Sequence, residues 1–279
     1  MKNDKLLDQF YTNPEIAKEC LKKLNDLIDL NQFDHLLEPS AGTGSFYSLL
    51  DKKKRIGLDI DPKLREIRKM NFFDYSPEKS GRIATIGNPP FGKKSKLAID
   101  FFNHASKFSE VIAFIVPLQW QKWSVQSKIG KEWSLILDQT LPEEAFIYLG
   151  KPYKVRCCFQ IWVKNDNRFP NLRMTQKLQT SHEDFEMYLY NNTQQALKFF
   201  DYDWDFAVPR QGYQDYSRRE INKENCEKTT QWIFFKAKND KVLNDLKKID
   251  FEKLSKKNTS TPGWGKADLV EHYIKMYKK

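Results

Sequence analysis

The chain of 279 residues has few cysteines and no long apolar run, and each shortage narrows the classes of protein it can belong to. Its four cysteines form no Cys-x-x-Cys pair and no zinc-ligand spacing, so we expect no metal site. Cys157 and Cys158 lie in an apolar stretch, which favours buried free thiols and a reducing compartment. No apolar run approaches the roughly 18–20 residues that cross a bilayer, and the charged start MKNDKLLDQF has no signal core. We therefore expect a cytoplasmic protein with no membrane segment.

Positive charge and aromatic rings are what the sequence has in excess. The net charge is +10, and Trp, Tyr and Phe number 7, 12 and 20. A basic chain rich in aromatics suits a polyanionic partner whose bases can stack, so nucleic acid is the expected partner. Charge alone does not settle this, because lysine-rich, AT-biased genomes give basic proteins of every kind. We find no internal repeat, and we expect a monomer.

Strand-like and helical patterns alternate through the first 164 residues, which predicts an α/β domain. The strands expected from apolar runs are residues 36–37, 55–61, 82–86 and 111–117. The helices expected between them are residues 15–30, a helix from near Ser45, a helix from Pro62, and residues 97–107. Residues 144–164 predict two strands flanking a basic turn with Tyr153 at its tip.

A polar, proline-containing stretch at residues 165–171 (NDNRFPN) marks the expected domain boundary. It divides the chain into a domain of residues 1–164 and a smaller mixed region of residues 165–279. In the second part we expect helices near residues 183–200 and 240–254, a strand at residues 231–235, and a last helix from about Lys266.

Two acidic strand ends lie near a glycine-containing loop, HLLEPSAGTGSF at residues 35–46. Small residues let a ligand approach the backbone closely. The carboxylate of Glu38 at the strand end suits a zwitterion or a cation better than a pyrophosphate. Asp59, in RIGLDID, lies near the offset at which an acid binds a ribose diol. Glycines alone are weak evidence, because any strand-to-helix loop can contain them.

The sequence RIATIGNPPFG at residues 82–92 is the most specific motif. The two prolines fix their own φ and disfavour helix at the preceding residue, which predicts a rigid extended loop. Prolines also lack N–H donors, so the loop presents hydrogen-bond acceptors beside the ring of Phe91. Such a loop suits a planar group with an exposed –NH2.

Read in order, EPSAGTGSF, GLDID, NFFDY and IGNPPFG resemble the motifs of S-adenosylmethionine-dependent amino-methyltransferases. The similarity is greatest to the N6-adenine DNA methyltransferases of the γ type and covers roughly residues 8–164. The resemblance implies a Rossmann-like domain with a mostly parallel seven-stranded sheet, followed by a target-recognition or nucleic-acid-binding region. It implies S-adenosyl-L-methionine as cofactor and methyl transfer to the N6 amine of a flipped adenine in DNA, as in restriction-modification.

The resemblance also implies roles for single residues. The cofactor would be bound by Phe10, Tyr11, Thr12, Glu38, Ala41, Gly42, Gly44, Asp59, Asn71 and Phe72. From the residues themselves, either Asn71 or Asp74 could bond the cofactor adenine. The target base would be held by Asn88, Pro89, Pro90 and Phe91, with Tyr153 on its other face. Further substrate contacts are expected at Lys93, Lys94, Lys154 and Arg210, with Arg218, Arg219, Lys266, Tyr213 and Trp264 as companions of Arg210.

Three alternatives stand beside DNA methylation. RNA adenine-N6 methylation fits the same residues, because nothing in the sequence reads a 2′-hydroxyl. A protein-glutamine methyltransferase shares the acceptor loop, although those enzymes usually have tyrosine where Phe91 stands. The last alternative is a catalytically silent nucleic-acid-binding protein with a methyltransferase fold.

Overall fold

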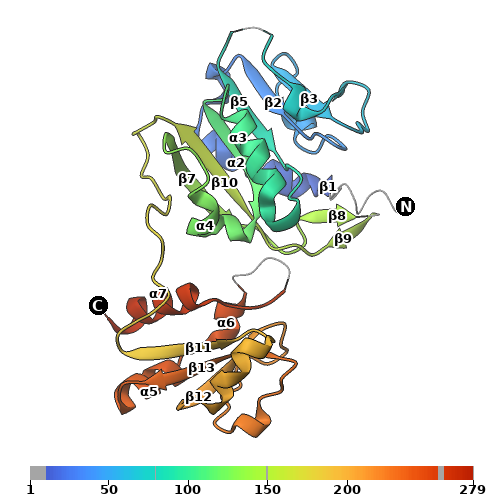
Figure 1. The fold of residues 1–279 in the computed structure, drawn as a ribbon. Coiled ribbons are helices and arrows are strands. Elements are labelled where there is room, and N and C mark those ends of the chain that lie inside the picture. Colours follow the sequence, from blue (N-terminus) through green and yellow to red (C-terminus); the bar gives the residue numbers. More distant parts are fainter. Residues whose placement is uncertain (1–10, 79, 149, 257–260, 279) are drawn as a thin grey trace. The chain divides into compact units, whose positions relative to one another are not determined.

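A computed structural model of the chain describes residues 11–78, 80–148, 150–256 and 261–278, and it divides the chain into two compact units (Figure 1). The division falls between Thr175 and Gln176, later than the expected boundary after Lys164. The intervening segment belongs to the first unit because it bonds to the edge of that unit's sheet. Asn171 accepts from the Leu135 N–H at 3.1 Å, and the Arg173 guanidinium donates to four backbone carbonyls at 2.5–3.2 Å.

The first unit is built on a seven-stranded sheet in the order β4-β3-β2-β5-β6-β10-β7. All neighbouring strands are parallel except at β10, which is antiparallel to both β6 and β7. The expected Rossmann-like α/β fold with a mostly parallel seven-stranded sheet is therefore confirmed. The strands are β2 His35–Glu38, β3 Arg55–Asp59, β4 Arg68–Lys69, β5 Ile83–Gly87, β6 Val111–Pro117, β7 Trp133–Thr140 and β10 Cys157–Lys164.

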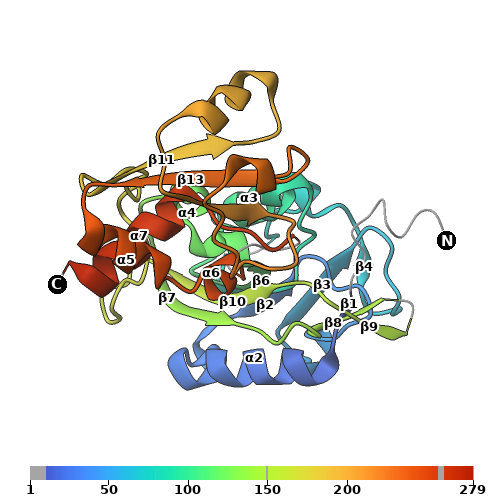
Figure 2. The same ribbon diagram turned by 90° about the horizontal axis from the view of Figure 1, so that it is seen from below.

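Helices cover both faces of this sheet (Figures 1 and 2). Helix α2, Pro14–Leu27, packs on one face with Leu36, and helix α3, Lys96–Ala105, packs on the other with Leu37. Consecutive residues of a strand point to opposite faces, so a strand covered on both sides is apolar throughout. This explains why β6 is buried at every position. A short helix, α4 Trp123–Gln126, follows β6.

Two helices expected in this unit are absent. From Ser45 onward there is only a 3-10 turn, η2 Tyr47–Leu49, and residues 60–67 form bends and turns. The Lys63 N–H donates to the Gly42 carbonyl of the neighbouring loop at 3.2 Å, and the Ile67 N–H makes a single turn bond to the Leu64 carbonyl at 3.2 Å. The other short 3-10 turns of this unit are η1 Leu30–Gln32, η3 Phe72–Asp74, η4 Lys93–Ser95 and η5 Leu118–Gln121, and the second unit has η7 Lys223–Asn225.

A second, small antiparallel sheet joins strand β1, Tyr11–Thr12, to a hairpin formed by β8, Phe146–Tyr148, and β9, Lys151–Tyr153. The expectation of two strands in residues 144–164 was wrong, because there are three. Tyr153 consequently does not lie at the tip of a turn, and it pairs with Phe146 across the hairpin.

The second unit holds an antiparallel sheet in the order β11-β13-β12. The strands are β11 Phe185–Tyr190, β12 Phe206–Gln211 and β13 Gln231–Ala237. Helices α5 Asp240–Lys247, α6 Phe251–Ser255 and α7 Lys266–Tyr277 contribute to the core on one face, and the 3-10 helix η6 Gln194–Asp201 packs on the other. The helix expected at residues 183–200 was wrong for residues 185–190, which form β11, whereas residues 194–200 are helical as part of η6. Phe185 and Met187 face one core while Tyr190 faces the other, which is the alternation of a strand.

All four cysteines are buried and free, which confirms the expectation for Cys157 and Cys158. Burial raises the pKa of Cys20 to about 12 and also raises that of Cys157. No helix in the described part of the chain is long and apolar enough to span a membrane.

Candidate functional site

A pocket opens at the carboxyl ends of β2, β3 and β5, where the strand order reverses. From β2 the chain proceeds outward to β3 and β4, then returns to place β5 on the other side of β2. Loops diverge at such a switch point and leave a crevice, which is where open α/β sheets bind ligands. The lining residues are Tyr11, Thr12, Glu38, Pro39, Ser40, Ala41, Gly42, Thr43, Ser45, Asp59, Ile60, Asp61, Met70, Asn71, Phe72, Asn88, Pro89, Pro90, Phe91 and Phe101.

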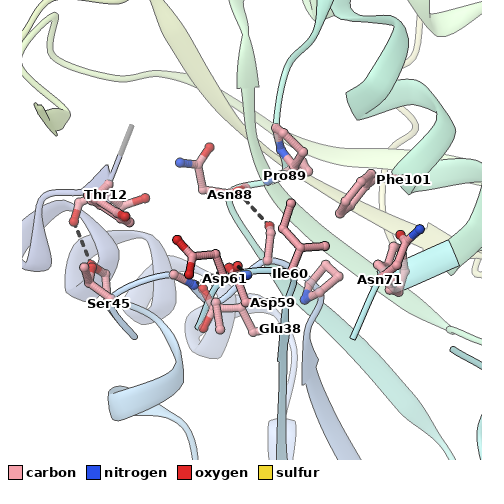
Figure 3. Close-up of a pocket in the computed structure, with 18 of the residues that line it drawn as sticks. Thr12, Glu38, Ser45, Asp59, Ile60, Asp61, Asn71, Asn88, Pro89 and Phe101 are labelled. Carbon is pink, nitrogen blue, oxygen red and sulfur yellow. Dashed lines mark hydrogen bonds between the residues drawn. The ribbon is translucent and has the colours of Figure 1, made fainter. Parts of the chain in front are cut away.

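The glycine loop after β2 is fixed by bonds to two other elements. Gly42 has φ +50°, and its N–H donates to Asp59 Oδ2 at 2.7 Å. A Cβ at Gly42 would lie 3.0 Å from the Tyr11 ring, so the loop and β1 pack as closely as glycine allows. The Ser45 hydroxyl donates to the Thr12 carbonyl at 2.7 Å (Figure 3). These bonds hold β1 over one end of the pocket.

Three carboxyl groups line the pocket, those of Glu38, Asp59 and Asp61 (Figure 3). Asp59 Oδ1 accepts from the Asp61 N–H at 2.8 Å, so both of its oxygens are oriented by backbone donors. Glu38 is 2% exposed, and its Oε2 has no hydrogen-bond partner among the described residues. Burial raises the pKa of Glu38 well above its usual value, and the nearby charge of Asp59 adds to the shift.

The charged side chains among the described lining residues are all acidic. None of the described residues that form the pocket wall is Lys, Arg or His. The acidic groups therefore have no cationic partner among the described residues of the wall. Asp61 forms an ion pair at 2.5 Å with Lys63, which lies outside the wall. An electrostatic environment of this kind suits hydroxyl and cationic groups and disfavours a phosphate.

The opposite end of the pocket is apolar and aromatic. Phe72 and Phe101 have ring centroids 5.0 Å apart, and Ile60 is 50% exposed beside them. Figure 3 shows Asn71 and Phe101 at this end, away from Thr12. The side-chain oxygen of Asn71 accepts from the Phe73 N–H at 3.2 Å. Of the two alternatives Asn71 and Asp74, the pocket wall includes Asn71.

The loop after β5 forms the remaining wall. The Asn88 carbonyl accepts from the Ser40 hydroxyl at 2.9 Å, which ties this loop to the one after β2. Pro89 is buried, and the Phe91 ring stands perpendicular to that of Phe146 with centroids 6.0 Å apart. Figure 3 shows Asn88 and Pro89 across the cavity from Asp59. The structure thus brings Asn88, Pro89, Pro90 and Phe91 to the same cavity as the acidic residues.

Some residues named from the sequence do not line this pocket. Phe10 lies outside the described residues. Gly44 packs against Leu64, whose Cδ1 would lie 2.5 Å from an added Cβ. The pocket wall includes none of the five residues expected to contact the substrate, which are Tyr153, Lys93, Lys94, Lys154 and Arg210. Their contacts with substrate stay predictions.

Conversely, sequence reasoning gave no pocket role to Pro39, Ser40, Thr43, Ser45, Ile60, Asp61, Met70 or Phe101. An acidic strand end was a signal for Asp61, which flanks Asp59 in GLDID. Nothing local distinguishes Phe101 from a core residue of its helix, because it comes to the pocket through the packing of α3 against β6 and η3.

In the second unit, the basic residues singled out from the sequence bond internally. Arg210 is half-buried and donates to Gln231 Oε1 at 2.6 Å. The Arg219 guanidinium donates to the Ile249 carbonyl at 2.7 Å, and Lys266 donates to the Met187 carbonyl at 2.7 Å. Burial lowers the pKa of both groups.

The other three companions of Arg210 are also engaged within this unit, where Arg218 donates to the Tyr213 hydroxyl. Arg218 pairs with Glu220 and Glu227, and Trp264 is fully buried. These contacts, together with those of Arg219 and Lys266, stabilise the unit. The contacts to phosphate or base edges expected of Arg218, Arg219 and Lys266, with Tyr213 and Trp264 beside them, stay predictions.

No protein-family model matches the chain. Among solved structures, it is similar to a proposed RNA methyltransferase from Pyrococcus horikoshii, with 19% identity over 57% of this chain and 87% of that one (TM-score 0.45). It is also similar to the type I restriction-modification methyltransferase subunit from Streptococcus thermophilus, with 16% identity over 57% of this chain and 46% of that one (TM-score 0.42). A third is the 23S rRNA methyltransferase ErmE, with 17% identity over 59% and 72% (TM-score 0.42).

Proposed function

We propose that the protein transfers a methyl group from S-adenosylmethionine to the N6 amine of an adenine flipped out of DNA. The observation that carries this proposal is the composition of the pocket wall. One side is acidic with no Lys, Arg or His among its described residues, and the other side is the acceptor loop Asn88-Pro89-Pro90-Phe91. The first side suits a cationic cofactor, and the second suits a neutral planar amine.

The cofactor's chemistry matches the acidic and apolar ends of the pocket. S-adenosylmethionine carries a sulfonium and an ammonium, which the carboxylates would stabilise, and no phosphate. Asp59, already oriented by two backbone N–H groups, has lone pairs left for the ribose hydroxyls. The adenine ring would lie against Ile60, Phe72 and Phe101, with Asn71 at its polar edge. A pyrophosphate cofactor would meet carboxylates where it needs donors.

The acceptor loop accounts for the reaction. The lone pair of an exocyclic amine is delocalised into the ring, so the amine is a poor nucleophile. The Asn88 side-chain oxygen and the Pro89 carbonyl would accept its two N–H bonds and favour a pyramidal nitrogen. The nitrogen lone pair would then attack the methyl carbon in line with the departing sulfur. The sulfonium becomes a neutral thioether, and the methylated amine loses its extra proton to water.

This reaction depends on positioning and local electrostatics, with no covalent protein intermediate. The base has to leave the duplex to reach the loop, and stacking on Phe91 would offset part of the few kcal/mol that unstacking costs. The second unit would recognise the target. Similarity to a restriction-modification subunit and to an RNA methyltransferase is compatible with either nucleic acid, and DNA is our choice from the motif order.

The test uses tritiated S-adenosylmethionine with DNA, RNA and protein acceptors, followed by mapping of the labelled nucleoside. We expect label on N6-methyladenine in DNA. Asn88→Ala and Phe91→Ala should abolish transfer while cofactor binding, measured calorimetrically, changes little. Asn103→Ala, an exposed change on α3, is the matched control and should keep wild-type turnover. Turnover retained in both loop variants would refute the mechanism, and label in RNA or protein would replace the substrate.

A further inference from the structure

The turn that follows the acceptor loop holds two non-glycine residues in the left-handed conformation. Lys94 has φ 54° and Ser95 has φ 59°, shortly after Gly92 at φ 65°. In the described part of the chain, the other non-glycine residues with positive φ are Asn165 and Asn192. Asparagine tolerates this conformation, whereas lysine and serine adopt it at a cost in free energy. Backbone strain is therefore concentrated within four residues of Phe91.

A buried hydrogen bond accompanies this strain. Ser95 is 1% exposed, and its hydroxyl accepts from the side-chain amide of Gln119 in η5. The Ser95 N–H donates to the Gly92 carbonyl at 3.2 Å. A strained conformation persists only where its surroundings determine it strongly. The Gln119–Ser95 bond is a side-chain contact that fastens the turn.

The bond joins two loops at the edge of the sheet where the pocket lies. Gln119 follows β6, and Ser95 follows β5, and these two strands are parallel neighbours. From the turn, the Ala98 N–H donates back to the Phe91 carbonyl at 3.4 Å. Neither Gln119 nor Ser95 lines the pocket. Their influence on a bound base would therefore pass through the acceptor loop.

We propose that Ser95 and Gln119 are positioning residues, which hold the turn in its strained form so that Asn88 and Pro89 face the target amine correctly. The inference rests on the proposed function. Without the bond, Lys94 and Ser95 would relax out of the left-handed region and the acceptor loop would shift. A misplacement of about 1 Å can cost on the order of 100-fold in rate, so the effect should appear in kcat.

Two substitutions at the same position separate strain from simple loss of a hydrogen bond. Ser95→Ala removes the acceptor and keeps the steric cost of a left-handed residue, so kcat should fall at least tenfold. Ser95→Gly also removes the acceptor, but glycine adopts this conformation without steric cost. Its kcat should stay within threefold of wild type. The KM for DNA and the Kd for S-adenosylmethionine should change less than twofold in both variants.

A rescue experiment provides the second readout. Gln119→Leu should lower kcat as Ser95→Ala does, and adding Ser95→Gly should restore most of it. Adding Asn165→Gly instead relieves a left-handed residue elsewhere in the same unit, and it should restore nothing. Thermal unfolding of each variant establishes that it is folded.

Equal kcat in Ser95→Ala and Ser95→Gly, or unchanged kcat in Gln119→Leu, would overturn this inference while leaving the proposed function intact. If the wild-type protein transfers no methyl group to any acceptor, both fail.

Discussion

The hydroxyl of Ser40 donates a hydrogen bond to the backbone carbonyl of Asn88 at 2.9 Å, across 48 residues of sequence. Ser40 follows β2 and Asn88 follows β5, so the bond spans the point where the strand order reverses. It links the wall that we assign to the cofactor with the wall that we assign to the target base. The relative position of the two walls determines whether methyl donor and acceptor meet in line.

Replacing Ser40 by alanine should therefore slow methyl transfer more than it weakens cofactor binding. One neutral hydrogen bond contributes about 0.5–1.5 kcal/mol, which corresponds to a kcat roughly 2- to 13-fold lower. Single-turnover kinetics with bound cofactor measure it. The control is Ser106→Ala, which removes a 2.9 Å hydroxyl–carbonyl bond to Asn103 at the end of α3. Equal effects of the two changes would contradict the role given to Ser40.

Gly42→Ala should weaken S-adenosylmethionine binding because it adds both strain and a steric conflict. The left-handed φ costs about 1–2 kcal/mol for alanine, and the new Cβ would lie 3.0 Å from the Tyr11 ring. Gly150→Ala is the matched control, since Gly150 has φ +73° with nothing within 4 Å of an added Cβ. Both variants should lose a few degrees of melting temperature, about 2–4 °C per kcal/mol. Calorimetry should show a weaker Kd for Gly42→Ala alone.

The buried carboxyl of Glu38 should make the stability of the ligand-free protein depend on pH. Burial raises its pKa in the folded state above the usual value of 4.5, so the folded protein holds a proton that the unfolded chain has released. The free energy of unfolding consequently falls as pH rises from about 4.5 to the higher folded pKa. Glu38→Gln cannot ionise, and it should raise the melting temperature more at pH 8 than at pH 5. An identical shift at both pH values would contradict this assignment.

Cofactor binding should release a proton if Glu38 ionises against the cationic methionine end of the ligand. The affinity for S-adenosylmethionine would then rise with pH. Titrations in two buffers of different ionisation enthalpy give the number of protons released. Glu38→Gln should abolish that release, and the control Glu144→Gln, at an exposed position, should leave it unchanged.

Arg173 should be necessary for the stability of the first unit. Its guanidinium donates to the carbonyls of Gly130, Trp133, Gln126 and Ile129, which lysine cannot reach together. Arg173→Lys should lower the free energy of unfolding by about 2–3 kcal/mol, since bonds from charged donors are strong. Urea denaturation measures the change, with the exposed Arg168→Lys as control. A fragment of residues 1–175 should likewise be more stable than one of residues 1–164.

Binding to DNA should weaken steeply with salt, because lysine and arginine contacts to phosphate release counterions. Lys93 is exposed in the turn after the acceptor loop. Lys93→Gln should reduce the slope of log K against log salt by about 0.9 if it meets one phosphate. The control Lys275→Gln alters a lysine paired with Glu271 at 2.7 Å in the second unit, and its slope should match wild type. A flat salt response of the wild-type protein would exclude a phosphate-binding surface.

The sequence by itself determined which motif follows each central strand and which chemical groups the loop after that strand carries. Glu38, Asp59 and Asn88 each stand at or just beyond the end of an apolar run, and parallel strands bring such ends to one edge. The helices α2, α3 and α7 were also readable, since periodicity and capping are local properties. Local patterns misled at residues 185–190, where the apolar alternation of a strand was interpreted as part of a helix.

Only the tertiary structure decided the contacts between segments that are far apart in the sequence. Tyr11 and Thr12 come to the pocket because β1 pairs with β8, and Phe101 comes there because α3 packs against β6 and η3. The bonds from Ser40 to Asn88 and from Gln119 to Ser95 depend on which strands are neighbours. The periodicity of a chain records which side of an element is buried. It does not record what that side packs against, because this follows from strand order and from the loops that fold over the sheet's edge.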